Sequence, residues 1–241
     1  PESLRAFEPS PILLAMLSKR RVITMKKRFV AAGAAVSLAS LMVLSASAET
    51  KTYDVASFTG VKVSNGISVD ITVGGAQSIE AEASAERLER LRIDSDDGVL
   101  RIRLKRKNNS GWNWGNSGGN VNVAITVPTL SLVDVSSGAD VDATGVDSDV
   151  VTLDASSGAD MSISGTCGSI RADASSGSDI DARDLVCMSA NADVSSGANI
   201  RVHATKDFNG DASSGGNIDV YGNPSSVNSS ESSGGDIDLR G

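Results

Sequence analysis

The sequence contains few of the residues from which most enzyme sites and large cores are built. Aromatic residues make up 3% of the 241 positions, and there is a single histidine, His203, and only two cysteines. One histidine argues against a Ser-His-Asp hydrolase and against a multi-histidine metal centre. Two cysteines argue against a disulfide-dense scaffold. We therefore expect a regularly packed core of small aliphatic side chains, and we expect no enzyme.

The first 48 residues predict an export signal rather than part of the fold. Met25 is followed by three basic residues, an apolar run over 29–44 and an A-S-A triplet that ends at Ala48, which together are typical of a secretory signal peptide. A membrane anchor is the alternative, but glycine and serine interrupt the run, and a span needs about 18 or more apolar residues. We expect cleavage after Ala48, with residues 1–24 as an upstream extension. The protein would then be exported to the periplasm, the outer-membrane surface or the medium, with no transmembrane segment left.

Charge divides the remaining chain into two parts. Residues 49–128 hold ten basic and ten acidic residues, whereas residues 129–241 hold five basic and 18 acidic residues, a net charge of −13. So acidic a segment repels nucleic acid and anionic lipid. We expect no nucleic-acid partner, and either bound cations or a solvated acidic surface.

A repeated phrase in residues 129–241 predicts the architecture. Six copies place Ser-Ser-Gly between two runs in which apolar and polar residues alternate, as they do in strands. The repeats are anchored by Gly138, Gly158, Gly177, Gly197, Gly215 and Gly234. Their spacing of about 19 residues is too short for two-helix repeats and is typical of solenoids built from strands. With Ser-Ser-Gly as the corner, we predict an all-β parallel β-helix, or the closely related β-roll.

Stacked coils align equivalent residues into columns. The clearest predicted core column is Val141, Met161, Ile180, Ile200, Ile218 and Ile237. Cys167 and Cys187 each lie ten residues before an anchoring glycine, so they occupy the same phase of adjacent coils. Strands stacked about 5 Å apart bring two such cysteines within disulfide range. We predict a Cys167–Cys187 disulfide that staples two coils, with a pair of free thiols as the alternative.

Acidic residues form two further columns. One holds Asp134, Asp154, Asp173, Asp193 and Asp211, ending in Ser230; the other holds Asp140, Asp160, Asp179, Asn199, Asn217 and Asp236. Unit charges about 5 Å apart repel by roughly 0.8 kcal/mol even in water, which favours bound cations or raised carboxyl pKa values. Calcium prefers oxygen ligands, so the first four members of the first column and the first three of the second are candidate calcium ligands. The alternative is a solvated acidic face, in which Asn199 and Asn217 relieve the repulsion by amide stacking.

Residues 49–128 also predict strands. Apolar and polar residues alternate on both sides of Asn65-Gly66, Asp96-Asp97-Gly98 is a hairpin signal, residues 84–92 suggest a helical turn, and a further strand ends at Pro128. We expect this β-rich part to cap one end of the solenoid, residues 129–241, and to form one domain with it.

Both tryptophans lie in a segment rich in glycine and asparagine, residues 108–120. Trp112 and Trp114 are candidate partner-binding residues, since indole rings stack on sugars. The alternative is a loop that folds back so that the rings cover the core of the cap. The basic run just before it, residues 101–107, would pair with the acidic solenoid, bind a polyanion or form a solvated strand face.

The order of these parts resembles a known bacterial family. The runs V-K-V-S-N-G-I-S-V (61–69), D-G-V-L-R-I (97–102) and I-T-V-P-T-L (125–130) precede the Ser-Gly-x-Asp/Asn repeats. Over about residues 52–241 this is similar to the domain of unknown function labelled "putative auto-transporter adhesin, head GIN domain". The resemblance implies a right-handed parallel β-helix in an exported protein, a role in adhesion and no catalytic residues.

The sequence therefore predicts an exported envelope or surface protein with a non-catalytic binding or scaffold role, of which adhesion to an unidentified surface ligand or glycan is the first version. The first alternative is a β-helix enzyme that processes polysaccharides, which needs carboxylates and a basic residue in a groove; Asp181, Arg183 and Asp184 are only a generic set of this kind. The second is a calcium-binding structural solenoid. A third is an ice- or mineral-ordering face built on the aspartate columns.

Overall fold

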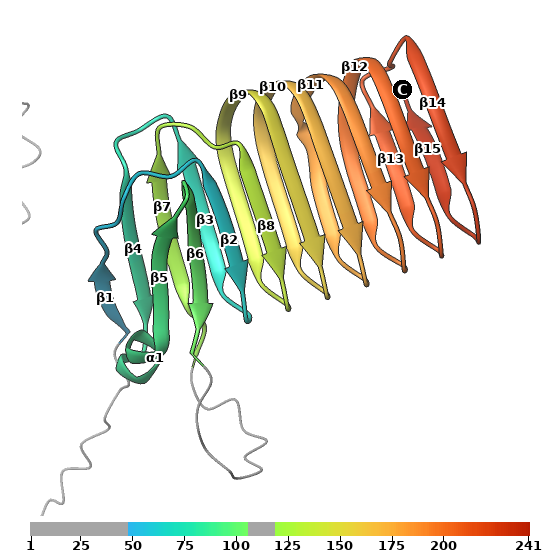
Figure 1. The fold of residues 1–241 in the computed structure, drawn as a ribbon. Helices are drawn as coiled ribbons and strands as arrows, with labels where there is room; N and C mark the ends of the chain where they lie inside the picture. Colours follow the sequence, from blue (N-terminus) through green and yellow to red (C-terminus); the bar gives the residue numbers. More distant parts are fainter. Residues whose placement is uncertain (1–47, 106–118) are drawn as a thin grey trace, which may run out of the picture. The chain divides into compact units, whose positions relative to one another are not determined.

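The computed structural model describes residues 48–105 and 119–241, and its strands form one continuous 15-stranded sheet that winds into a solenoid (Figure 1). The predicted signal peptide, apart from Ala48, and both tryptophans lie outside the described residues. The strands are β1 (Glu49–Thr52), β2 (Gly60–Ser64), β3 (Ser68–Val73), β4 (Ser78–Ala83), β5 (Leu91–Asp96), β6 (Val99–Leu104), β7 (Asn122–Val127), β8 (Leu132–Ser136), β9 (Asp140–Ser156), β10 (Asp160–Ser175), β11 (Asp179–Val194), β12 (Asn199–Ala212), β13 (Asn217–Tyr221), β14 (Ser226–Glu231) and β15 (Asp236–Arg240). One short helix, α1 (Ala85–Arg90), follows β4.

The repeat region stacks in parallel, as the sequence predicts. The long strands β9, β10, β11 and β12 pair side by side in parallel, and each runs from one Ser-Ser-Gly corner toward the next. Met161 lies opposite Val141 on one side and Ile180 on the other, so register partners are one repeat apart. The predicted all-β solenoid with coils of about 19 residues is confirmed.

Each long strand bends midway and so contributes to two faces of the coil. Face A is formed by β3, β7, β13, β15 and the first halves of β9 to β12, which follow a corner. Face B is formed by β2, β6, β8, β14 and the second halves of β9 to β12, which lead into the next corner. The register shifts between these halves, for example between Ile163 and Gly165, where the chain turns from one face to the other.

The corners depend on two consecutive residues with left-handed backbone conformation. In the second repeat these are Ser157, with φ of 58°, and Gly158, with φ of 66°. Adjacent corners are joined by a backbone hydrogen bond, such as the one that Gly158 N donates to the Ser176 carbonyl oxygen over 3.2 Å. A left-handed conformation costs most residues roughly 1–2 kcal/mol, so glycine suits the second position of the corner.

The core lies between the two faces and consists of aliphatic columns. The predicted column from Val141 to Ile218 is buried, with side-chain exposure of 4% or less, and Ile237 at its end is partly buried. Alanine fills many of the other inward positions, for example Ala172 and Ala192, which are register partners. The coil is therefore narrow enough for small side chains to fill it without aromatic rings.

The parallel stack extends further toward the N-terminus than the repeat indicates. Strand β2 lies between β6 and β8, and β3 lies between β7 and β9, all in parallel. Asn65-Gly66 is accordingly a corner like the others, and Gly66 N donates to the Ser137 carbonyl oxygen over 3.2 Å. Residues predicted as a cap thus contribute whole strands to the solenoid.

The remaining N-terminal elements close that end of the stack. Strands β1 and β4 extend the sheet in antiparallel fashion beyond β7, and β5 pairs in antiparallel fashion with β6 through the predicted turn at Asp97-Gly98. Antiparallel additions of this kind cover strand edges that would otherwise invite pairing with another chain. No helix in the described part of the chain has the length and apolar character needed to cross a membrane.

Two glycine substitutions compare backbone strain alone with backbone strain plus steric collision, because Gly158 and Gly165 both have positive φ. In Gly158→Ala the new Cβ would meet no atom within 4 Å, so only the left-handed φ opposes it, and we expect a loss of about 1–2 kcal/mol. In Gly165→Ala the new Cβ would come within 2.1 Å of the Val146 carbonyl oxygen. We expect a clearly larger loss of unfolding free energy for Gly165→Ala, measured by urea denaturation; equal losses would contradict this account of the two bends.

Candidate functional site

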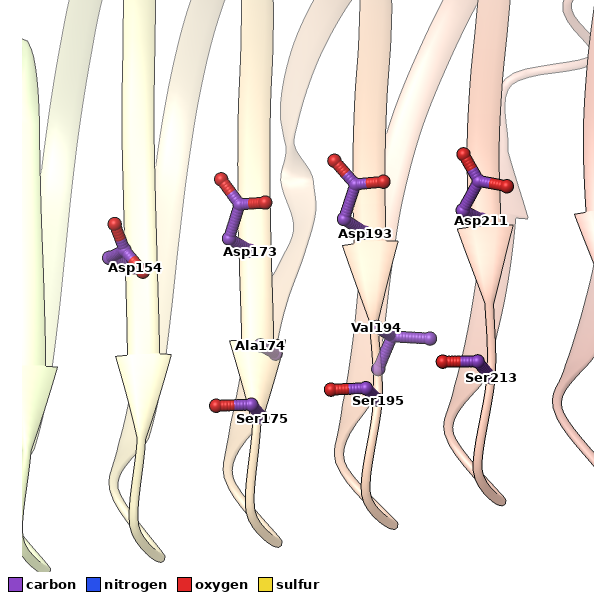
Figure 2. A pocket seen from close by; sticks show the side chains of 9 residues that line it. All are labelled: Asp154, Asp173, Ala174, Ser175, Asp193, Val194, Ser195, Asp211 and Ser213. Atoms are coloured by element: carbon purple, nitrogen blue, oxygen red, sulfur yellow. The ribbon is translucent and has the colours of Figure 1, made fainter. Parts of the chain in front are cut away.

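Face B carries a straight row of carboxylates. Register pairing places one aspartate on each of five neighbouring strands, and these residues, called the aspartate row below, are Asp134, Asp154, Asp173, Asp193 and Asp211. Figure 2 shows four of the carboxylates side by side on successive strands, with Ser175, Ser195 and Ser213 nearer the corners. Together with Ala174 and Val194 these residues line a shallow hollow that is open to solvent.

The carboxylates of the aspartate row repel one another and are partly buried. Partial burial, together with the neighbouring carboxylates of Asp134 and Asp173, raises the pKa of Asp154 above its usual range. Partial burial and the neighbouring Asp173 likewise raise the pKa of Asp193. Burial and like charges at strand spacing therefore both make ionisation of these carboxyl groups less favourable in the folded protein.

Two basic side chains offset part of this repulsion. The sequence alone did not indicate that either would lie beside the row. Lys62 on β2 lies 2.7 Å from Asp134, and Arg171 on β10 lies 2.9 Å from Asp173 and 3.6 Å from Asp193. Lys62 is 72 residues from Asp134 in the sequence, and the two meet only because β2 stacks against β8. Arg171 belongs to the repeat, but at the equivalent positions the neighbouring coils have Thr152 and Asn191.

The second acidic column lies on face A, and two of its positions hold neutral asparagine side chains instead of carboxylates. Asn199 Nδ2 donates to Asp179 Oδ1 over 2.6 Å, and Asn217 Nδ2 donates to Asn199 Oδ1 over 3.0 Å. The amide ladder considered in the sequence analysis is therefore present. At the other end of the column, partial burial and the adjacent Asp179 and Asp140 raise the pKa of Asp160.

A second shallow hollow lies over this end of face A. Its acidic lining residues include three members of this column, Asp140, Asp160 and Asp179, and three acidic residues outside it, Asp70, Asp142 and Asp181. Within the residues that the structure describes, no three or more His, Cys, Asp or Glu side chains are grouped as a metal-ion site. The carboxylates form rows along the stack, and calcium binding by them stays a prediction.

The basic run is paired locally where the structure describes it. Arg101 lies 3.2 Å from Asp96, and Arg103 lies 3.1 Å from Asp94, both across the β5–β6 hairpin. Register pairing also places Arg101 next to Lys62 on face B. The cationic strand thus lies on the same face as the aspartate row, nearer the capped end of the stack.

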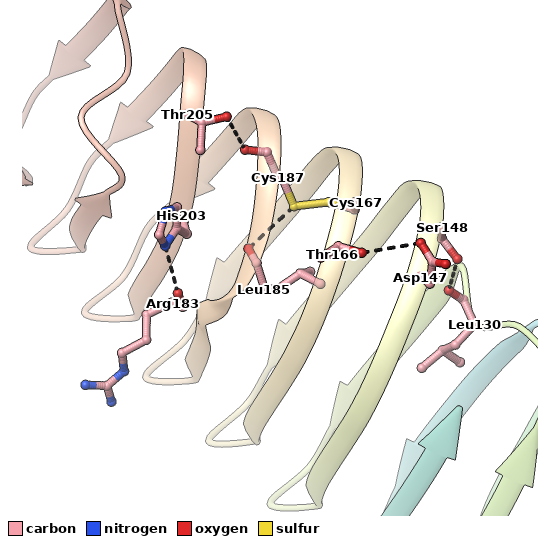
Figure 3. Close-up of a disulfide and its surroundings, with 10 residues drawn as sticks. All are labelled: Leu130, Asp147, Ser148, Thr166, Cys167, Arg183, Leu185, Cys187, His203 and Thr205. Atoms are coloured by element: carbon pink, nitrogen blue, oxygen red, sulfur yellow. Dashed lines mark hydrogen bonds between the residues drawn. A yellow bond between two sulfur atoms is a disulfide. The ribbon is translucent and has the colours of Figure 1, made fainter. Parts of the chain in front are cut away.

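The cysteine pair joins two coils at the bend between the faces. Cys167 and Cys187 are register partners with Cα atoms 4.5 Å apart, and their sulfur atoms are bonded (Figure 3). On a chain-entropy estimate, closing a loop of this length stabilises the fold by about 3 kcal/mol. Neighbouring bends are tied by Ser148 Oγ to the Leu130 carbonyl oxygen over 2.8 Å and by Thr205 Oγ1 to the Cys187 carbonyl oxygen over 3.1 Å. Disulfides of this kind are typical of proteins outside the reducing cytosol.

Two of the three residues considered for polysaccharide cleavage, Asp181 and Arg183, are engaged with each other. Arg183 forms an ion pair and hydrogen bonds with Asp181, which lowers the pKa of that carboxyl group through the hydrogen bonds and the positive charge, despite the opposing effect of burial. His203 Nδ1 lies 3.2 Å from the Arg183 carbonyl oxygen. Asp181 is thus held as an ionised partner of Arg183, which is unsuited to a general acid.

Comparison with protein-family models finds one match. The model described as "putative auto-transporter adhesin, head GIN domain" matches residues 57–224, which includes every strand from β2 to β13. No curated protein sequence matches the chain.

Solved structures share the fold at low sequence identity. A crystal structure of a putative adhesin from Bacteroides fragilis is 17% identical, with a TM-score of 0.65, and the match covers 81% of this chain and 98% of that one. A putative adhesin from Parabacteroides distasonis is 16% identical, with a TM-score of 0.52 and coverage of 80% and 97%. The similarity extends over nearly the whole of both solved chains and shows a common fold.

The raised carboxyl pKa values give a prediction with a defined sign. Ionisation of Asp154 costs more in the folded protein than in the unfolded chain, so its contribution to stability falls as pH rises from the usual aspartate range through the raised value. We expect Asp154→Asn to increase the unfolding free energy at pH 7 by up to about 1 kcal/mol at low salt. The gain should disappear below the usual aspartate pKa and shrink at high salt.

The matched control is Asp149→Asn, because Asp149 is exposed and lies outside both columns. It should leave the melting temperature nearly unchanged at every pH. Added calcium should not raise the wild-type melting temperature if the row is a solvated face. A stabilising effect of calcium that Asp154→Asn removes would instead support the calcium hypothesis, and a destabilised Asp154→Asn protein at pH 7 would contradict the repulsion.

Proposed function

The chain belongs to the family described as "putative auto-transporter adhesin, head GIN domain". On that premise we propose that it is an exported, non-catalytic binding module of the cell envelope that uses the aspartate row as a contact surface. The observation that carries this proposal is the row itself. It presents five carboxylates at strand spacing on a backbone that the stack holds rigid.

Rigidity favours recognition of a repetitive partner. Each aspartate is fixed by its strand, and neighbouring coils are joined by ladder hydrogen bonds, buried columns and the Cys167–Cys187 disulfide. A surface whose geometry is already set loses little conformational entropy on binding. Because its charge is negative, it suits a partner with regularly spaced cationic or hydrogen-bond-donating groups, such as an amino-sugar polymer or a basic protein.

Several features support a binding role over catalysis. The family and the solved structures of the same fold carry adhesin names. The two acidic hollows are shallow and open to solvent, whereas catalytic groups usually act in a water-excluded site. The disulfide supports a location outside the cytoplasm, and the predicted signal peptide would direct the chain there.

Binding of the purified chain to arrays of envelope glycans and of surface proteins tests this function. The row variant Asp154→Asn/Asp173→Asn/Asp193→Asn should weaken binding to any captured ligand by about tenfold or more. The matched control Asp149→Asn/Asp184→Asn/Asp207→Asn changes charge equally at exposed positions outside the row, and it should bind as the wild type does.

A third variant distinguishes the row from the tryptophan segment. Trp112→Ala/Trp114→Ala should retain binding if the row is the contact surface. If this variant loses binding while the row variant keeps it, the contact lies in residues 108–120 instead. Equal binding by the row variant and the control would overturn a role for the row. Cleavage of an arrayed glycan by the wild type would support the polysaccharide-processing alternative.

A further inference from the structure

Face B changes sign toward the capped end of the stack. Along the register line of the aspartate row, the strand next to β8 is β2, where Lys62 lies opposite Asp134. The strand after it is β6, where Arg101 lies opposite Lys62 (Figure 1). The line therefore holds two cations followed by the five carboxylates of the row. A surface with groups of both signs fits a ligand that also carries both.

A third shallow hollow, called the cationic hollow below, lies over the basic part of this line. Its three basic side chains are between 43% and 51% exposed, so their charged ends reach solvent. The polar residues that line it are Lys62, Ser64, Arg101, Arg103, Asp134 and Ser136. An incoming anion can therefore approach the basic groups directly.

The two cations of the line are drawn in opposite directions. Arg101 on β6 lies 3.2 Å from Asp96 on β5, and Lys62 on β2 lies 2.7 Å from Asp134 on β8. Strands β5 and β8 flank the β6–β2 pair on opposite sides. Like charges on neighbouring strands repel, and this arrangement separates them. An anion placed between the two would be attracted by both.

The arginines of the hollow retain hydrogen-bond donors for a further anion. Arg101 contacts Asp96 through Nη1, and Arg103 contacts Asp94 through Nη2 over 3.1 Å. A guanidinium group has five N–H donors, and its planar fork matches the geometry of a carboxylate. The hollow can therefore bind a carboxylate while the contacts to β5 keep both arginines in place.

A line of serine hydroxyl groups runs beside the charged line. Each serine lies two residues after a charged residue of the line, and Figure 2 shows the part of it that borders the aspartate row. Its members are Ser64, Ser136, Ser156, Ser175, Ser195 and Ser213. Because a hydroxyl group both donates and accepts hydrogen bonds, such a line favours a hydroxyl-rich partner, a glycan, over a basic protein.

We propose that face B binds a zwitterionic glycan, with a carboxylate of the glycan in the cationic hollow and its ammonium groups along the aspartate row. This inference rests on the binding role proposed above and names the class of ligand. Asp134 is already paired with Lys62, so the next carboxylate along the line is Asp154, two strands from Lys62. Strand spacing of about 4.8 Å then places the ligand's opposite charges about 10 Å apart. A polymer of alternating uronic acids and amino sugars has this chemistry.

Titration calorimetry with three oligosaccharide probes of equal length tests the class of ligand. Hyaluronan from which the N-acetyl groups have been removed alternates carboxylate and ammonium groups, unmodified hyaluronan carries only the carboxylates, and chitosan carries only ammonium groups. The purified chain should bind deacetylated hyaluronan at least about tenfold more tightly than chitosan, and it should not bind unmodified hyaluronan measurably. Equal affinity for deacetylated hyaluronan and chitosan, or no binding of deacetylated hyaluronan, would overturn the inference.

The variant Arg101→Gln/Arg103→Gln removes two charges of the cationic hollow at exposed positions. It should weaken the binding of deacetylated hyaluronan about tenfold and leave the binding of chitosan unchanged. The matched control Arg183→Gln/Arg201→Gln removes two paired charges from face A and should bind both probes as the wild type does. Circular dichroism checks the fold, and Arg101→Gln alone takes the place of the double variant if that variant is unfolded.

The row variant Asp154→Asn/Asp173→Asn/Asp193→Asn separates this inference from the proposed function. It should weaken the binding of deacetylated hyaluronan and of chitosan alike. If it does so while the variant of the cationic hollow binds deacetylated hyaluronan as the wild type does, the row is a contact surface but the zwitterionic ligand is wrong. If the row variant binds both probes as the wild type does, the proposed function itself fails.

Discussion

The structure depends on in-register stacking of parallel strands, in which each residue lies directly beside its counterpart in the next coil. Because of this constraint, residues at the same position of successive coils form a column of similar side chains. For aliphatic positions the effect is favourable, because Met161, Ile180 and Ile200 form a continuous buried column. For charged positions the same geometry is costly, because it brings like charges to strand spacing. Both the core and the candidate site follow from this one arrangement.

The chain reduces that cost in two ways along its length. Cations lie beside the aspartate row at Lys62 and Arg171, and amides replace carboxylates at Asn199 and Asn217. The row is therefore retained at some expense in stability, which is what a surface kept for binding would require.

Much of the fold could be predicted because equivalent residues of successive repeats occupy the same position in successive coils. Spacing and alternation predicted the coils, the core column and the register that pairs Cys167 with Cys187. The placement of β2 between β6 and β8 could not be predicted, since nothing local reveals that a strand early in the chain is inserted between two later ones. For the same reason Lys62 was missed as the partner of Asp134.

Engineered cysteine pairs across two coils test most directly whether neighbouring coils stack in register. In a Cys167→Ala/Cys187→Ala background, Ser169→Cys with Ser189→Cys joins register partners on face B, whereas Ser169→Cys with Asn191→Cys joins positions two residues out of register. In-register stacking predicts that the first pair forms an intramolecular disulfide readily under mild oxidation and that the second does not, because its Cα atoms lie beyond disulfide range. Equal yields from the two pairs, or a higher yield from the second, would contradict the stacking on which the fold and its charged rows depend.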